Sequence, residues 1–339
     1  MEIHDLKVLV IGAGSMGNRR IRNMIALGIN QIGVFDFNAT RLEKFAEVAE
    51  VRTFGDFESS ITEFEPNAFV ICTPPDKHFS YVAKGIELGI PSFLEASVED
   101  FQTVAEYAKL SKENDSFVAP STTMRHFNFA EKIRENLQIG IIGEPLYITY
   151  HVGQYLPDWH PWEDIKDFYV SNPSTAACKE IVPFELTWLC EILDDYEPEV
   201  LTSVISRTGQ IDAPIDDLYN AVFRSASGCL LNLTIEILSR PSATRKFHLV
   251  GTNGTITYDA LTKEITTETA QPRNLDVLDM TVKPVDGYIY SDQPYEKEMA
   301  AFFSAILKTD KKLFPNDLDR DSKVLKLLQL IEEKAVKIG

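Results

Sequence analysis

Apolar runs and amphipathic segments alternate regularly over the first 120 residues. Short apolar runs are typical of buried strands, and the amphipathic segments between them are typical of helices. We predict strands over 8–11, 31–35, 52–54, 68–72, 91–95 and 116–120. We predict the intervening helices over 18–27, 39–48, 57–64, 78–88 and 98–114. Repeated strand–helix units of this kind predict a parallel, doubly wound sheet with right-handed crossovers.

Beyond residue 120 the pattern becomes rich in strands. The expected strands are 145–151, 200–207, 219–224, 229–238, 245–250 and 255–259, and the expected helices are 128–137, 295–307 and 319–336. An Asn-Gly turn between the last two strands indicates a hairpin. The length of 339 residues favours two domains. We predict an α/β domain over 1–120, and an α+β domain with an open, mainly antiparallel sheet over 121–339.

The first strand runs directly into the sequence G-x-G-x-x-G, and a predicted helix follows it. In this order Gly12 permits a tight turn, Gly14 lets the backbone approach a pyrophosphate, and Gly17 lets the helix pack close to the strand. The phosphates would then meet free N–H groups at the start of the helix, beside Ser15 and Met16. Glycines that serve only a turn are the alternative.

An acidic residue ends the second strand, about 20 residues after the glycine motif, as a dinucleotide site requires. Asp36 stands where a carboxylate accepts hydrogen bonds from the adenosine ribose and repels a 2′-phosphate. NAD is therefore favoured over NADP. Arg41, one turn into the next helix, could meet a 2′-phosphate or could be a solvated residue beside Glu43.

The composition is that of an ordinary soluble globular protein, with 44% hydrophobic and 25% charged residues. A net charge of −18 argues against a nucleic-acid partner, because phosphate binding depends on clustered Lys and Arg. No apolar run approaches the ~18 residues of a membrane span. The four cysteines form no C-x-x-C pair, which indicates reduced thiols and no zinc site. With an acidic N-terminal segment, this predicts a cytoplasmic protein.

Several segments in a fixed order carry a family resemblance. They are VIGAGSMG at 10–17, CTPPDKH at 72–78, FLEAS at 93–97, MRHFN at 124–128, HLVGTNGTITYD at 248–259 and YEKEMAAFFSAI at 295–306. Together they resemble the glucose–fructose oxidoreductase, inositol dehydrogenase and MocA family (GFO/IDH/MocA) over essentially the whole chain. The resemblance implies an N-terminal Rossmann domain, and a second domain whose open sheet forms a dimer or tetramer interface. It also implies NAD(P)-dependent chemistry on a hydroxyl of a sugar, cyclitol or nucleotide-linked sugar.

The resemblance also assigns residues around the cofactor. The matching residues of the turn that flanks it are Thr73, Pro74, Pro75 and His78, and Glu95 ends the next strand. His78 could equally be a helix N-terminal residue without a ligand. Arg125 matches an arginine of the segment between the domains, near the nicotinamide pocket. It could hold a substrate carboxylate or phosphate, or it could form a surface ion pair.

Two family motifs are altered in this chain. The strand that usually ends in Glu-Lys-Pro ends here in Glu95-Ala96-Ser97, and alanine cannot transfer a proton. The second motif pairs an Asp with a His four residues later on one helix face. In register, Ile181 and Glu185 take those positions; a shift by one residue gives Glu180 and Phe184. In either register the Asp/His pair is absent.

Polar residues near the second motif are our candidates for proton transfer. Lys179 could polarise a carbonyl or hydroxyl oxygen, Glu185 could act as a base if partly buried, and His160 lies in the neighbouring proline-rich loop. Tyr155 and Trp162 of the same loop offer aromatic faces for stacking on a sugar ring. The loop could instead be an ordered surface segment with its aromatic residues packed on the core.

Two functions are consistent with these patterns. The first is an NAD(P)-dependent oxidoreductase for a sugar, sugar acid or nucleotide-linked sugar; the altered segments resemble a subgroup found with bacterial surface-sugar biosynthesis, including nonulosonic acids. The second is a redox-silent dinucleotide-binding protein, a sensor or pseudoenzyme. We expect NAD as cofactor, with NADP as the alternative, and no metal. The expected partners are a small sugar-type molecule and further copies of the chain, as a homodimer or homotetramer.

Overall fold

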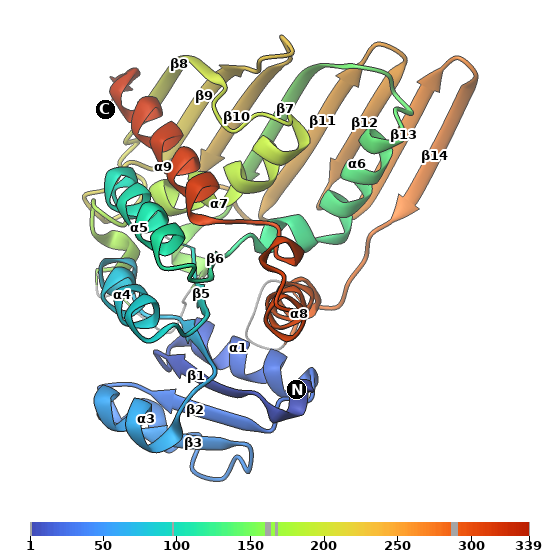
Figure 1. Cartoon of the computed structure of the whole chain (residues 1–339). Coiled ribbons are helices and arrows are strands. Elements are labelled where there is room, and N and C mark those ends of the chain that lie inside the picture. The colour runs from blue at the N-terminus through green and yellow to red at the C-terminus, as the bar shows by residue number, and fades with distance from the viewer. Residues whose placement is uncertain (1, 97, 160–163, 167–168, 286–290, 339) are drawn as a thin grey trace. The chain divides into compact units, whose positions relative to one another are not determined.

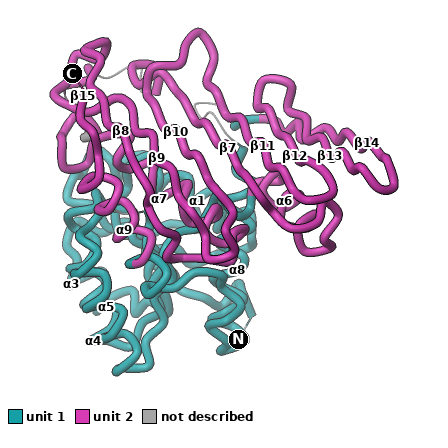
Figure 2. Tube along the Cα trace, turned by 90° about the horizontal axis from the view of Figure 1, so that it is seen from above, with its two compact units in different colours: residues 1–126, 284–322 teal, residues 127–283, 323–339 magenta. Residues whose placement is uncertain are grey.

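The computed structural model describes residues 2–338, except 97, 160–163, 167–168 and 286–290. The chain forms two compact units (Figure 2). Unit 1 comprises residues 1–126 and 284–322, and unit 2 comprises residues 127–283 and 323–339. Of the described helices, none has the length and apolar character needed to cross a membrane.

Unit 1 contains a six-stranded sheet in the order β3-β2-β1-β4-β5-β6, and all its neighbouring strands are parallel (Figure 1). The strands are β1 Lys7–Ile11, β2 Gln31–Phe35, β3 Val51–Phe54, β4 Ala68–Ile71, β5 Ser92–Leu94 and β6 Val118–Pro120. The helices are α1 Ser15–Ala26, α2 Ala39–Glu43, α3 Phe57–Phe64, α4 His78–Leu88, α5 Phe101–Glu113 and α8 Gln293–Leu307. Short 3₁₀ segments are η1 Ile3–Asp5, η2 Pro75–Lys77, η3 Thr123–His126 and η6 Lys311–Leu313. The predicted doubly wound parallel sheet is confirmed.

Both faces of this sheet are covered, which explains why its strands are continuous apolar runs. On one face Phe93 of β5 contacts Phe302 of α8, with ring centroids 5.8 Å apart. On the other face Phe69 of β4 contacts Phe57 of α3 at 6.2 Å. The sheet is therefore held between two packed layers.

Helix α8 belongs to unit 1 although it lies late in the sequence. The predicted division at residue 120 placed it in the second domain. It joins unit 1 because Met299, Phe302 and Phe303 are fully buried in one apolar cluster with Phe93. A helix of this kind is placed by the surface that its apolar side covers, and chain order carries no information about that surface.

Unit 2 contains a nine-stranded sheet in the order β14-β13-β12-β11-β7-β10-β9-β8-β15. Its strands are β7 Pro145–Gly153, β8 Glu199–Ser206, β9 Leu218–Arg224, β10 Leu230–Glu236, β11 Thr244–Gly251, β12 Gly254–Asp259, β13 Glu264–Ala270, β14 Arg273–Asp279 and β15 Ala335–Ile338. Only the β7–β10 and β8–β15 pairs are parallel. The predicted mainly antiparallel sheet is confirmed, and so is the hairpin between β11 and β12.

One face of this sheet carries the helices of unit 2, which are α6 Asn128–Gln138, α7 Ala177–Ile192 and most of α9 Leu318–Glu333 (Figure 1). Each helix is tied to an inward-facing strand residue. Asn136 of α6 donates to Thr267, Tyr150 of β7 donates to Glu185 of α7, and Ser203 of β8 donates to the Ile331 carbonyl of α9. Two 3₁₀ segments, η4 Leu156–Asp158 and η5 Tyr169–Ser171, complete the unit.

Candidate functional site

The three motif glycines adopt the geometry that a dinucleotide turn needs. Gly12 has a φ of +101°, and a Cβ there would lie 2.8 Å from the Cys72 carbonyl oxygen. A Cβ on Gly17 would lie 1.9 Å from the Gly12 carbonyl oxygen, so only glycine lets α1 approach this closely. Nothing lies within 4 Å of a Cβ built on Gly14. The backbone at Gly14 is therefore open to a ligand, and Ser15 and Met16 begin α1 directly after it.

Asp36, which follows β2, holds the glycine turn in place. Its Oδ2 accepts from the Ala13 N–H and its Oδ1 from the Asn38 N–H, each at 2.8 Å. Lys44 Nζ donates to the Ala13 carbonyl at 2.8 Å, so the turn is clamped from both sides. A carboxylate has about four lone-pair positions, which leaves capacity for ribose hydroxyls. The role of Lys44 was missed, because the sequence shows it only as one polar helix residue among several.

Arg41 pairs with Asp36 and not with Glu43. Its Nη1 lies 3.6 Å from Asp36 Oδ2, and its side chain is 54% exposed. Burial and the neighbouring Arg41 lower the pKa of Lys44. Two cations thus lie beside the Asp36 carboxylate.

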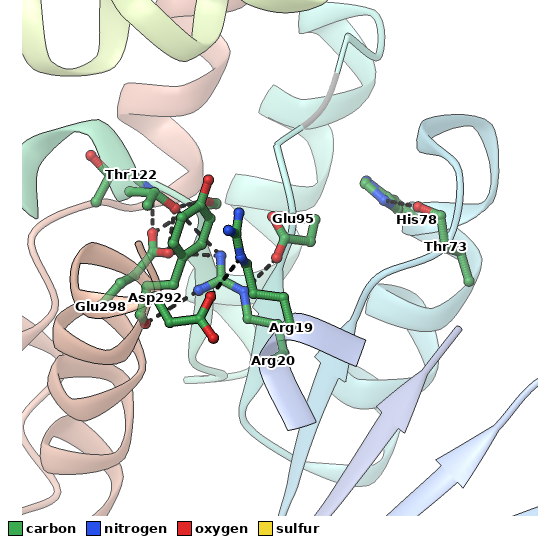
Figure 3. A network of polar contacts seen from close by, with 11 residues as sticks. Arg19, Arg20, Thr73, His78, Glu95, Thr122, Asp292 and Glu298 are labelled. Carbon is green, nitrogen blue, oxygen red and sulfur yellow. Dashed lines mark hydrogen bonds and ion pairs between the residues drawn. The ribbon is translucent and has the colours of Figure 1, made fainter. Parts of the chain in front are cut away.

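The turn after β4 contains a buried polar atom without a partner. The Thr73 hydroxyl oxygen is buried and has no hydrogen-bond partner among the described residues. Pro74 is exposed and Pro75 is buried behind it. His78 is fully buried, and its Nε2 donates to the Thr73 carbonyl at 2.7 Å (Figure 3). His78 has no exposed surface for a ligand, so it does not fit the predicted role of a direct cofactor contact.

Burial lowers the pKa of His78 to about 4. Its imidazole is therefore neutral at neutral pH and carries a single proton. That proton lies on Nε2, because the Thr73 carbonyl can only accept.

Glu95 follows β5 and belongs to a buried ionic network (Figure 3). Its Oε1 lies 2.5 Å from Nε of Arg20, which is fully buried on α1. Arg20 Nη2 also lies 2.8 Å from Oε2 of Glu298 on α8. Glu298 accepts from the Thr122 N–H at 2.5 Å and from the Thr123 hydroxyl at 2.6 Å. The network fixes Glu95 at the carboxyl end of the sheet and leaves its Oε2 without a hydrogen bond to any described residue.

The chemistry of these residues suits NAD. The open backbone at Gly14, the spare lone pairs of Asp36 and the unpartnered Thr73 hydroxyl all follow the carboxyl ends of β1, β2 and β4. In open parallel sheets, dinucleotides bind in the crevice outside these ends. Within the described residues, no group of three or more His, Cys, Asp or Glu side chains could hold a metal ion.

Glu185, on α7 in unit 2, has a structural role. Its side chain is fully buried, and its Oε1 lies 2.8 Å from Arg245 Nη2. Its Oε2 accepts from Tyr150 at 2.8 Å and from the Trp188 indole at 3.1 Å. The Glu185 carboxylate is thus ion-paired and hydrogen-bonded inside the core. The prediction of Glu185 as a partly buried base is therefore corrected, because the burial is complete and Arg245 holds the charge.

Lys179, six residues earlier on α7, retains partial exposure. Its ammonium group lies 3.1 Å from Oε1 of Glu332 on α9, and its side chain is 23% exposed. Tyr219 also donates to Glu332, at 3.3 Å, and burial followed by the Glu332 charge raises the pKa of Tyr219. Lys179 thus lies in a partly exposed ion pair.

Of the remaining predicted residues, the structure describes Arg125 and Tyr155. Arg125 is half-buried in η3 at the end of the first segment of unit 1. Tyr155 is half-buried, and the Arg240 guanidinium lies over its ring, 4.7 Å from the centroid. His160 and Trp162 lie outside the described residues.

The fold and the glycine turn define a dinucleotide-binding protein with a Rossmann unit followed by an open sheet. Two family models match it. "Oxidoreductase family, NAD-binding Rossmann fold" matches residues 6–121, and "GFO/IDH/MocA C-terminal domain" matches residues 130–257. The chain therefore belongs to the GFO/IDH/MocA family and is an NAD-dependent oxidoreductase. The resemblance inferred from the sequence is confirmed.

Solved structures share this fold. An oxidoreductase from Agrobacterium radiobacter in complex with NAD+, L-tartaric acid and magnesium has a TM-score of 0.83 and 14% identity, covering 97% of this chain and 96% of that one. A levoglucosan dehydrogenase in complex with NADH and levoglucosan gives 0.79 and 16%, covering 97% and 96%. UDP-N-acetylglucosamine 3-dehydrogenase from Acidithiobacillus ferrooxidans gives 0.77 and 16%, covering 97% of each chain. A comparison with curated protein sequences finds no match.

The buried ion pair of unit 2 gives a testable expectation. Replacing Glu185 with Ala removes the carboxylate that pairs with the buried guanidinium of Arg245, which should lower the free energy of unfolding by about 3–5 kcal/mol. The double variant with Arg245→Met should recover part of that loss, because no isolated charge remains. Urea unfolding measures both variants. A Glu185→Ala variant of unchanged stability would contradict the structural role.

Proposed function

We propose that this NAD-dependent oxidoreductase acts on a hydroxyl or carbonyl group of a sugar, sugar acid or nucleotide-linked sugar. The observation that carries the proposal is the cofactor crevice of unit 1, with its open Gly14 backbone and unpartnered Thr73 hydroxyl. The substrate class is supported by relatives of the same fold, which include a levoglucosan dehydrogenase and a UDP-N-acetylglucosamine dehydrogenase. A place in bacterial surface-sugar biosynthesis, including nonulosonic acids, belongs to the same proposal.

The cofactor-holding residues have separate tasks. Gly12, Gly14 and Gly17 admit the diphosphate, with the α1 N-terminus at Ser15 and Met16 beside it. Asp36 accepts from the adenosine ribose, and Arg41 would matter if NADP were used. Thr73, Pro74, Pro75 and Glu95 flank the nicotinamide half. NAD supplies the hydride chemistry when bound, so the side chains need only orient the reacting carbon and handle one proton.

Lys179 is our candidate for handling that proton. Position 96 carries alanine, and Glu185 is neutralised in the core by Arg245. Lys179 keeps an ammonium group near solvent that can polarise a substrate oxygen. His160 is the second candidate, from the loop that also carries Tyr155 and Trp162 as stacking faces.

Arg125 is proposed as an anion clamp. A guanidinium presents a rigid fork of donors that matches a carboxylate or a phosphate in two parallel hydrogen bonds. Sugar acids and nucleotide-linked sugars both carry such a group. The clamp also offsets the net charge of −18, which would otherwise repel an anionic substrate.

Self-association as a homodimer or homotetramer is also proposed, through the face of the unit 2 sheet that carries no helix. Thr149, His248 and Thr257 lie there, in a row across β7, β11 and β12. We expect sedimentation equilibrium at micromolar concentration to give a dimer or tetramer. A strict monomer would contradict the proposal.

We also propose a cytoplasmic location. The four free cysteines support it, because reduced thiols are typical of proteins in that compartment.

Cofactor binding is tested at Asp36. Replacing Asp36 with Ala removes the ribose acceptor and the anchor of the Ala13 N–H, so the Kd for NAD should rise about tenfold or more. The wild-type protein should bind NAD more tightly than NADP, and the variant should lose that preference. Calorimetric titration of both cofactors measures these values. Unchanged NAD affinity in the variant would remove Asp36 from the site, and a wild-type preference for NADP would assign Arg41 to a 2′-phosphate.

Turnover is tested at Lys179 with a panel of sugars, sugar acids and nucleotide-linked sugars, followed by NADH absorbance. Lys179→Met should lower kcat at least ~100-fold on a substrate that turns over, with NAD affinity unchanged. Lys323→Met, which removes a partly exposed ammonium ion-paired with Glu197 in the same unit, is the matched control. Full activity in Lys179→Met would transfer the role to another group such as His160. Bound NAD without turnover on any substrate would favour a redox-silent protein.

A further inference from the structure

The turn after β4 uses each of its three carbonyl oxygens internally. The Thr73 carbonyl accepts from His78 Nε2 at 2.7 Å (Figure 3). The Pro74 carbonyl accepts from the Lys77 N–H at 3.0 Å, and the Pro75 carbonyl accepts from the His78 N–H. The first of these bonds is the only one made by a side chain. Without His78, the Thr73 carbonyl would have no donor in the turn.

The same turn keeps two hydrogen-bond donors unused. Both prolines lack an N–H group, so the donors left are the backbone N–H and the hydroxyl of Thr73. Neither donates to any residue that the structure describes, and the hydroxyl oxygen is buried. The Thr73 nitrogen lies 3.0 Å from a Cβ built on Gly12, which places these donors beside the glycine turn. A buried donor without an acceptor is costly, which points to a ligand that supplies one.

We propose that His78 is a positioning residue that orients the donor surface of the Thr73–Pro75 turn, which is the Thr73 N–H and hydroxyl, toward acceptor oxygens of the nicotinamide half of NAD. The inference rests on cofactor binding at this crevice. By holding the Thr73 carbonyl, His78 fixes the orientation of the Thr73 backbone and side chain. The Thr73 N–H and hydroxyl are then available to donate to the cofactor.

The chemistry of His78 suits this task. Its Nε2–H provides one fixed donor, and its Nδ1 has no donor among the described residues. Because burial lowers the pKa of His78 to about 4, no charge is placed beside the cofactor near neutral pH. A glutamine amide can reach the same carbonyl with an N–H, whereas leucine offers none. Comparing these two substitutions separates the hydrogen bond from the volume of the side chain.

The test measures binding of NAD and of AMP by calorimetry. AMP reaches only the adenosine half beside Asp36, so it reports on the rest of the crevice. In His78→Leu the Kd for NAD should rise about tenfold or more, and the Kd for AMP should change less than about twofold. His78→Gln should restore NAD affinity to within about threefold of wild type. Thr73→Val, which removes the hydroxyl and leaves His78 in place, should also weaken NAD and spare AMP. His4→Leu, at an exposed histidine of the same unit, is the matched control.

Each outcome decides the inference. Unchanged NAD affinity in His78→Leu, or equal weakening of NAD and AMP, would overturn it in favour of a purely structural role. A His78→Gln variant as weak as His78→Leu would also overturn it. If His78→Leu fails to fold, Thr73→Val decides, and unchanged NAD affinity there contradicts the donor surface. Failure of the wild-type protein to bind NAD would instead contradict the cofactor site itself.

Discussion

The close approach of α1 to the glycine turn is the constraint on which unit 1 depends. A single Cβ at Gly17 would lie 1.9 Å from the Gly12 carbonyl oxygen, so the helix can start here only with glycine. This placement brings Arg20, one turn further along α1, to Glu95 after β5 and to Glu298 on α8. The backbone geometry at Gly17 and the ion pairs of Arg20 thus order the same edge of the sheet. The ionic network orders three segments that are distant in the sequence around the carboxyl ends of the strands.

In unit 2, ion pairing gives a residue of the altered motif on α7 a structural role. Glu185 occupies a position where the sequence favours an acid–base residue, yet Arg245, Tyr150 and Trp188 bind its carboxylate in the core. An unpaired charge at that depth would be strongly unfavourable, so the pair is a condition of folding and not a device for moving protons. Lys179 differs because its partner Glu332 is partly exposed. Glu185 therefore has a structural role, whereas Lys179, outside the altered motif, keeps partial exposure.

Local patterns were sufficient to predict most of the fold. Apolar runs and the glycine motif identify the parallel sheet, because both are encoded within a few neighbouring residues. The strands β13 and β14 were missed, since their alternating Thr, Glu and Asp residues show no apolar run. The last helix was expected to reach residue 336 but ends at Glu333, and residues 335–338 pair with β8 as an exposed edge strand.

The candidate site was predictable only where its residues are neighbours in sequence. Gly12, Gly17 and Asp36 follow from spacing, whereas the Arg20–Glu95 pair joins residues 75 positions apart. Burial decided the roles of His78 and Glu185, and burial is a property of the packed molecule. Lys44 lacked any signal, because its contact with the Ala13 carbonyl depends on how the chain turns after α2.

The central claim is that a complete NAD crevice operates here with a substituted proton-handling group. A crystal structure with NAD and a sugar that turns over tests it most directly. The account predicts Asp36 on the adenosine ribose, the Thr73 hydroxyl bound to the cofactor, and the ammonium of Lys179 within ~3 Å of the reacting oxygen. A structure in which only Ala96 and apolar groups face that oxygen would contradict the account.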